Sequence, residues 1–433
     1  MQLFYFCCGF LERHSIITCQ LQGHLMADTI DVNEKTTKFV AMQTAQGLVY
    51  VKSDSLDFYD YKSELNILNP VSGQLSATNS TYVDFDLNAA GVHRIDNMFF
   101  SVTITNSDAV NALLLVPLSF LINRVELLCN SATVATIYSQ DLFLQTLMSD
   151  SEMLAARGLS EGFVVSPTTG ALTADTSSIA ALGSRTYSLP IHSFLSQAFM
   201  PILKTNNAKV RVYFNAGSTL VQSTSVAAYT AISYGTPILH LQGRVYGRKT
   251  LDRLMDEYRK APHMARCIIR RQQIINLGGV TAGSEYQQLL GALTGSFSLI
   301  RFSLLPSGAQ QEQQSAYRQL SEISLYDAVG RPWSFAQISD ALIRQQVIPS
   351  KNNTLIAKSN YLYELPFARD PVGAFQTNRS AGSVYMDGRW NVRFKPAATS
   401  AGVDLIVNAH EYAVFRQDPD GSVKIMQIKS MEY

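Results

Sequence analysis

The chain has 433 residues, of which 16% are charged and 10% aromatic, and its formal net charge is +1. This length fits two domains, each of somewhat under ~200 residues and each able to bury a core. The many apolar runs, separated by Ser, Thr, Asn and Gln, exclude a disordered chain. The near-zero charge excludes recruitment of nucleic acid or an anionic membrane by a global field.

The first 25 residues differ in pattern from the rest. Three of the five cysteines precede Met26, and the apolar run over residues 3–10 has neither a basic flank nor a small-residue cleavage site. These features disfavour a signal peptide, and we expect the native chain to start at Met26. The sequence contains no uninterrupted run of about 18 apolar residues, so no transmembrane helix is predicted.

The two remaining cysteines, Cys129 and Cys267, each lie in an apolar, strand-like run. Their isolation gives no disulfide framework and no zinc spacing. We predict two buried thiols in a protein made in a reducing cytoplasm.

Residues 1–75 are predicted to form the leader and an arm. The part from residue 27 is polar with scattered aromatics and shows neither a helical nor a strand period. We expect it to order on neighbouring subunits. The alternative is a meandering first layer that packs on its own domain.

Residues 76–247 are predicted to form the first β domain. From Thr81 the residues alternate between apolar and polar, as in half-buried strands, and further strand-like runs follow at 99–105, 121–128, 133–138, 187–190, 210–214 and 237–245. Ser139 fits the N-cap of a helix that ends near Gly158. The stretches 163–186 and 215–236 are rich in Ser and Thr and are predicted to be exposed loops.

Residues 248–262 are predicted to form a connector helix, with Leu251, Leu254, Met255 and Tyr258 on one face and Thr250 as its cap. Residues 263–433 then form the second β domain and a C-terminal segment. Residues 309–319 and 339–346 are expected to be short helices in its loops.

Four segments of the first half recur in the same order in the second half. The pairs are Phe100–Ile104 with Phe297–Ile300, Ile122–Leu127 with Leu320–Leu325, Tyr187–Pro190 with Tyr363–Pro366, and Val210–Phe214 with Val392–Phe394. This order predicts one β unit used twice.

No motif for catalysis or metal binding is found in the sequence. Gly247-Arg248-Lys249-Thr250 lacks the Gly-Lys-Ser/Thr step of a phosphate loop and is interpreted as a helix start. Asp84 and Asp86 share a strand face and could hold a cation, but such pairs are common on solvated strands. Residues 418–421, Asp-Pro-Asp-Gly, are interpreted as a turn. We therefore expect no enzyme activity, no cofactor and no metal.

One charge concentration stands out between residues 244 and 271. It holds nine basic residues against three acidic ones. One interpretation is a solvated face or ion pairs between subunits; the other is contact with an anionic layer of lipid or nucleic acid. The candidate contact residues are Arg244, Arg248, Lys249, Arg253, Arg259, Lys260, Arg266, Arg270 and Arg271.

The sequence from Thr81 to Phe415 resembles the double jelly-roll major capsid proteins of tailless icosahedral viruses, a lineage that includes membrane-containing bacteriophages and adenovirus. The resemblance rests on the duplicated β unit, on residues 120–127 followed by Ile137-Tyr138 and a helix, and on Tyr187–Ile191 leading to Lys209–Val212. It implies an all-β fold of two consecutive eight-stranded jelly rolls with a connector helix and short helices in loops.

The resemblance also implies a function. A homotrimer with six jelly rolls would imitate a hexagon and tile an icosahedral virion shell. Its partners would be other copies of itself and neighbouring capsomers, with penton and minor capsid proteins, and internal membrane lipid or genome on the inner face.

Two rival functions remain open. A viral spike or lectin-like binding module would carry a fibrous stem or collagen-like repeat, and the sequence shows neither. A carbohydrate-active amidase with paired jelly rolls would need clustered acids beside aromatics, but Trp333 and Trp390 are the only tryptophans and no acid pair accompanies them.

Overall fold

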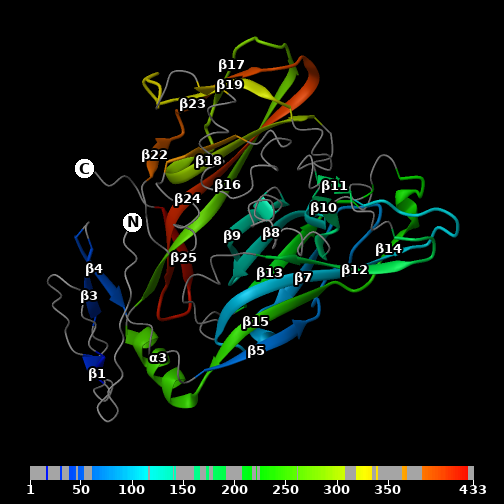
Figure 1. Ribbon diagram of the computed structural model, residues 1–433. Helices are drawn as coiled ribbons and strands as arrows, with labels where there is room; N and C mark the ends of the chain where they lie inside the picture. The colour runs from blue at the N-terminus through cyan, green and yellow to red at the C-terminus, as the bar shows by residue number, and fades with distance from the viewer. Residues whose placement is uncertain are drawn as a thin grey trace. The chain divides into compact units, whose positions relative to one another are not determined.

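The computed structural model describes most of the chain from residue 61 onward (Figure 1). The described residues are 61–115, 118–139, 141–142, 160–165, 172–174, 179–191, 207–216, 221, 225–260, 262–307, 318–333, 338–339, 363–367 and 383–427, together with four short strands before residue 53. The chain divides into two compact units, residues 1–62 with 246–251, and residues 63–245 with 252–433.

The first unit holds two short antiparallel pairs. Strand β1 (Ile16–Ile17) pairs with β2 (Ile30–Asp31), and β3 (Phe39–Thr44) pairs with β4 (Gly47–Lys52). The predicted start at Met26 lies outside the described residues.

The second unit begins with a two-sheet sandwich, here called the first sandwich. Its eight principal strands are β5 (Tyr61–Leu68), β6 (Thr81–Asp86), β7 (Arg94–Asn106), β8 (Ile122–Cys129), β9 (Ala132–Tyr138), β12 (Ser184–Pro190), β13 (Lys209–Phe214) and β15 (Ile238–Tyr246). One sheet has the order β12-β7-β15-β5 and the other β6-β13-β8-β9. The short strands β10 (Phe163–Val165), β11 (Leu172–Ala174) and β14 (Ile232–Tyr234) complete this part.

A second sandwich follows the helix α3 (Arg248–Lys260). Its principal strands are β16 (His263–Val280), β17 (Tyr286–Leu289), β18 (Thr294–Pro306), β19 (Leu320–Tyr326), β20 (Ile338–Ser339), β21 (Tyr363–Pro366), β23 (Asn391–Pro396) and β24 (Ser400–Gln417). The sheets have the orders β16-β24-β18-β21 and β17-β23-β19-β20, and β22 (Val384–Asp387) and β25 (Val423–Gln427) are added to the first of them.

The two sandwiches have the same topology. When the eight principal strands of each are numbered in chain order, one sheet runs 6-3-8-1 and the other 2-7-4-5 in both. Two four-stranded antiparallel sheets with these crossovers bury one face of each sheet and leave the other outside. The predicted all-β duplication is confirmed.

The predicted repeats fall on corresponding strands, namely the third, fourth, sixth and seventh of each sandwich. The residue match of the first repeat is wrong by three positions. Pro190 of β12 pairs with Phe99, and Pro366 of β21 pairs with Leu299. Phe99 therefore corresponds to Leu299.

The strands alternate between core and exterior, as a period of two requires. Phe100, Val102 and Ile104 of β7 point into the first core, and Phe302 and Phe394 point into the second. The first core also includes residues of the second sandwich. They lie near the N-terminal end of β16 and the C-terminal end of β24, and Cys267 and Phe415 are among them.

Two predictions of local structure need correction. Residues 27–75 are not free of strands, because they include β3, β4 and β5; β5 is an edge strand whose mostly half-buried or exposed residues hide the alternation. The connector helix begins at Arg248, so Thr250 lies inside its first turn and is not its cap. The short helices predicted at 309–319 and 339–346 lie largely outside the described residues.

In the described part of the chain, no helix is long and apolar enough to cross a membrane.

Candidate functional site

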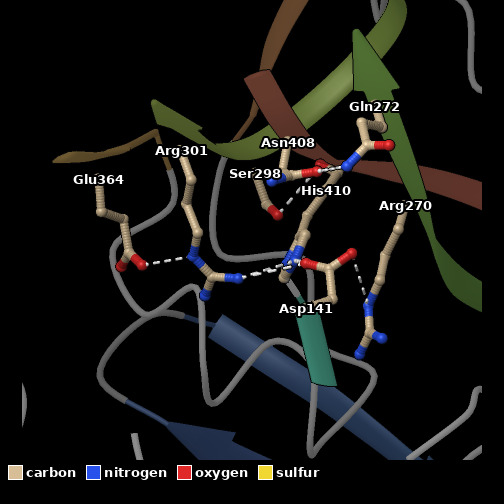
Figure 2. A network of polar contacts seen from close by, with 8 residues as sticks. All are labelled: Asp141, Arg270, Gln272, Ser298, Arg301, Glu364, Asn408 and His410. Atoms are coloured by element: carbon tan, nitrogen blue, oxygen red, sulfur yellow. Dashed lines mark hydrogen bonds and ion pairs between the residues drawn. The ribbon is translucent and has the colours of Figure 1, made fainter. Parts of the chain in front are cut away.

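A group of buried charged residues joins the two sandwiches (Figure 2). Asp141 of the first sandwich lies against the outer face of sheet β16-β24-β18-β21. One of its carboxylate oxygens is 3.6 Å from Nη1 of Arg301 and 3.6 Å from Nε2 of His410. Its other oxygen is 4.0 Å from Nε of Arg270. Asp141 thus stands between Arg270 on one side and Arg301 and His410 on the other.

The local sequence explains how these groups meet. A helix begins at Ser139, directly after β9, and this places Asp141 in its first turn. Arg270, Arg301 and His410 come from β16, β18 and β24, at positions that point away from the second core. Alternation along each strand therefore gathers their side chains on one sheet face.

Further hydrogen bonds extend this junction along the sheet. Arg301 donates from Nε to Glu364 on β21 at 2.8 Å, and its Nη1 lies 3.3 Å from Nε2 of His410. The amide of Gln272 donates to Asn408 at 3.1 Å. Each of these charged groups is at most 6% exposed. Buried charges persist in proteins when they are paired, as they are here.

The charges at the junction balance when His410 is neutral, with two carboxylates facing two guanidiniums. Burial lowers the pKa of His410 to about 4, and the neighbouring arginines act in the same direction. Burial alone would raise the pKa of Asp141, but Arg270, His410 and Arg301 together lower it below its ordinary value. The junction therefore holds an ionised Asp141 and a neutral histidine near neutral pH.

Glu411 follows His410 in the sequence but points to the opposite side of β24, as predicted from the period of a strand. Its carboxylate accepts a hydrogen bond from Nε of Arg271 at 2.6 Å. Burial raises the pKa of Glu411, although Arg271 opposes the shift. His410 and Glu411 therefore take part in separate polar contacts on opposite sides of β24.

The nine basic residues predicted to contact an anionic layer differ in burial and in ion pairing, as far as the structure describes them. The prediction is wrong for Arg270, which is buried against Asp141 and cannot reach an external surface. Arg244 pairs with Asp96 at 2.9 Å, and Arg271 pairs with Glu411.

Helix α3 carries five of the other basic residues, and all five are exposed. They are Arg248, Lys249, Arg253, Arg259 and Lys260, of which Arg259 pairs with Asp256 at 3.3 Å. The side chain of Arg266 lies outside the described part. Contact of the α3 residues with an anionic layer stays a prediction.

The other candidate positions have structural roles. Asp84 accepts two hydrogen bonds from Arg211, at 2.6 and 2.9 Å, which lower its pKa, so it is already paired with a cation. Residues 418–421 form the predicted turn between β24 and β25, with Gly421 at φ +84°. Among the described residues no group of three or more His, Cys, Asp or Glu could hold a metal.

Sequence reasoning did not identify the junction between the sandwiches. A helix start at Ser139 was predicted, but no role was predicted for Asp141, Arg301 or Glu364. A signal was present, since Arg301 interrupts the apolar strand Phe297–Leu305. An arginine inside such a run predicts a buried partner, but the partner's position depends on the tertiary structure.

Three solved structures of viral origin share this architecture. The VP54 protein of PBCV-1, in a model fitted into a reconstruction of the virophage Sputnik, has a TM-score of 0.62 at 11% identity, covering 86% of this chain and 98% of that one. The Faustovirus major capsid protein has a TM-score of 0.62 at 10% identity, covering 86% of this chain and 91% of that one. A quasi-atomic model of the PBCV-1 capsid has a TM-score of 0.61 at 12% identity, covering 86% of this chain and 98% of that one.

The chain has the double jelly-roll fold. Its two jelly rolls are the first and second sandwiches, and the Asp141 junction lies between them. No family model and no curated protein matches the sequence. At 10 to 12% identity the similarity to the solved structures is one of fold.

Proposed function

We propose that this chain is a major capsid protein, located in the shell of a virion. The observation that carries the proposal is the double jelly roll itself, which matches solved capsid proteins over 86% of the chain. Each of the two sandwiches has a hydrophobic core, as expected of two jelly rolls in one chain.

The duplicated fold supports a trimer as the building block. Three chains with two similar sandwiches each supply six similar units, which can close into a ring with near-hexagonal outline. Such rings tile a flat facet, and copies of the same ring are then the main partners of the chain. Obligate interfaces of this kind are large and rich in apolar area.

The exposed basic residues of α3 support a contact with an anionic layer beneath the shell, of lipid headgroups or packaged genome. Each lysine or arginine near a cytoplasmic-type membrane surface contributes on the order of 1 kcal/mol. Many copies in a shell add these small contributions, so weak single sites become effective together.

Native mass spectrometry of the purified protein at micromolar concentration tests the proposal. The expected species has three times the mass of one chain. A protein that remains monomeric over this range would refute the trimeric capsid function.

A further inference from the structure

The hydrophobic core of the first sandwich contains residues that lie far along the chain, on three strands of the second sandwich. Cys267 and Ile269 come from β16, Ala413 and Phe415 come from β24, and Val423 and Ile425 of β25 pack against the same core. The side chains of Ala413 and Phe415 are completely buried. The first sandwich is therefore closed by segments that follow it in the sequence.

Strand pairing explains how these segments reach the first core. β16 and β24 pair with each other along their whole length. On the other side of β24, the pairing with β18 ends at Tyr412, and from Ala413 onward β25 takes the place of β18. The three strands β16, β24 and β25 thus extend the sheet beyond the second core. This extension contacts the edge strand β9 of the first sandwich.

The hairpin that β24 and β25 form has a turn held by its own polar contacts. Asp418 accepts a hydrogen bond from Nε of Arg416 at 2.6 Å, and its other carboxylate oxygen lies 3.5 Å from Nζ of Lys424. At the tip of the turn, the side-chain amide of Asn130 donates to the carbonyl oxygen of Gly421 at 3.4 Å. Asn130 belongs to the turn between β8 and β9, so the hairpin meets the first sandwich at its tip as well as along one face.

β25 is held less firmly than the two strands beside which it lies. Its five residues, Val423–Gln427, are half-buried or exposed, and among the described strands it pairs with β24 alone. Short segments with little buried area open at a lower free-energy cost than central strands do. β25 is therefore the part of the extension that is most easily released from the first core.

We propose that the hairpin of residues 413–427, here called the clasp, closes the first sandwich, and that this closure follows the folding of the second sandwich. Domains of a growing chain usually fold in the order of their synthesis. The first sandwich is an exception, because a chain whose synthesis has not reached β25 lacks part of its first core. The second core, as far as it is described, contains no residue beyond Ala409, so it forms without the clasp.

The clasp has a consequence for assembly, which rests on the proposed capsid function. Only a chain with a closed first sandwich offers other copies a finished surface, so unfinished chains stay out of the shell. The closure itself is a property of one chain and is tested without assembly.

Two charges on the inner side of the clasp test whether it closes the first sandwich. Val423→Asp with Ile425→Asp should raise the rate of iodoacetamide labelling of Cys129 by about tenfold or more, because Cys129 lies in the first core beside the turn that meets the clasp. The matched control, Val110→Asp with Val226→Asp, places the same charges at side chains that are 81% and 77% exposed, and it should leave Cys129 protected.

Tryptophan fluorescence reports on the second sandwich in the same samples. Trp333 and Trp390 are the only tryptophans of the chain, and their rings lie 5.8 Å apart in that sandwich. Their emission should be the same in the clasp variant and the wild type. Unchanged labelling of Cys129 would overturn the clasp. A changed emission would overturn it too, since the two sandwiches would then open together. Neither outcome bears on whether the wild type forms trimers, which decides the proposed function.

The order of closure is tested by refolding the wild-type chain from urea. We expect tryptophan emission to recover first and the protection of Cys129, measured with pulses of methyl methanethiosulfonate, to recover more slowly. Simultaneous recovery, or protection of Cys129 before the emission changes, would overturn the proposed order.

Discussion

Asp141 of the first sandwich lies 3.6 Å from the guanidinium of Arg301 in the second, and both side chains are almost completely buried. The carboxylate of Asp141 therefore compensates the positive charges of Arg270 and Arg301, which the second sandwich directs toward the first. Removal of one partner from such a group leaves an unpaired buried charge, which costs more than the pair contributes.

We therefore expect Asp141→Asn to lower the free energy of unfolding by about 3 to 5 kcal/mol. Urea unfolding measures the loss. The control is Asp256→Asn, which breaks the exposed pair with Arg259 and should cost less than about 1 kcal/mol. Similar losses in the two variants would mean that the junction has no special role in stability.

The stability of the protein should fall as the pH drops from about 6.5 to 4. His410 has a pKa of about 4 in the folded chain and an ordinary pKa of 6.5 in the unfolded chain. In this window the unfolded chain binds a proton that the folded chain does not, so acid favours unfolding. The full effect of His410 is on the order of 3 kcal/mol.

The variant His410→Gln isolates this contribution. Its stability should change less with pH than that of the wild type over the same window, because the glutamine does not titrate. Glu411, whose pKa is raised, has an effect of opposite sign, but it is present in both proteins and cancels in the difference. Parallel pH profiles of the two proteins would rule out His410 as the source.

The thiols of Cys129 and Cys267 should resist alkylation in the native protein. Burial raises the pKa of each to about 12, so almost no thiolate is present at pH 8. Iodoacetamide treatment followed by peptide mass spectrometry should modify both only after denaturation. Rapid native labelling of either residue would contradict their burial.

Gly243 should not tolerate a side chain. A Cβ there would lie 2.5 Å from the carbonyl oxygen of Arg94 and 2.8 Å from Val92. Gly243→Ala is expected to destabilise the fold by about 1 to 3 kcal/mol through this clash. Gly279→Ala, where the nearest atom is 3.8 Å away, is the control, and thermal melting compares the two.

The exposed basic residues of α3 should increase binding to anionic vesicles. Lys249→Glu with Lys260→Glu is expected to weaken co-sedimentation with phosphatidylserine liposomes at least tenfold, since each lysine contributes about 1 kcal/mol. The control Arg331→Glu with Arg389→Glu makes the same charge change on the second sandwich. If all three proteins bound equally and the binding did not depend on salt, the α3 residues would serve only in ion pairs or in contact with water.

Strand patterns and repeats in the sequence predicted a duplicated β unit, and the resemblance to double jelly-roll capsid proteins implied the topology of that unit. Val210–Phe214 and Val392–Phe394 alternate so regularly that their equivalence is visible without a structure. The edge strand β5 was missed because it packs on one neighbour only and keeps Leu65 and Ile67 exposed. Its residues therefore lack the alternation that burial imposes on a central strand.

The junction could not be predicted from the sequence, since its members are separated by up to 269 positions between Asp141 and His410. Arg270 shows the difficulty, because a local charge count placed it with exposed basic residues. Its burial follows from the docking of the first sandwich, which no local pattern records.

Electron microscopy of the purified protein tests the capsid function most directly. The account predicts pseudo-hexagonal particles built from three chains, and closed shells at high concentration. Isolated monomers, or filaments without a closed ring, would contradict it.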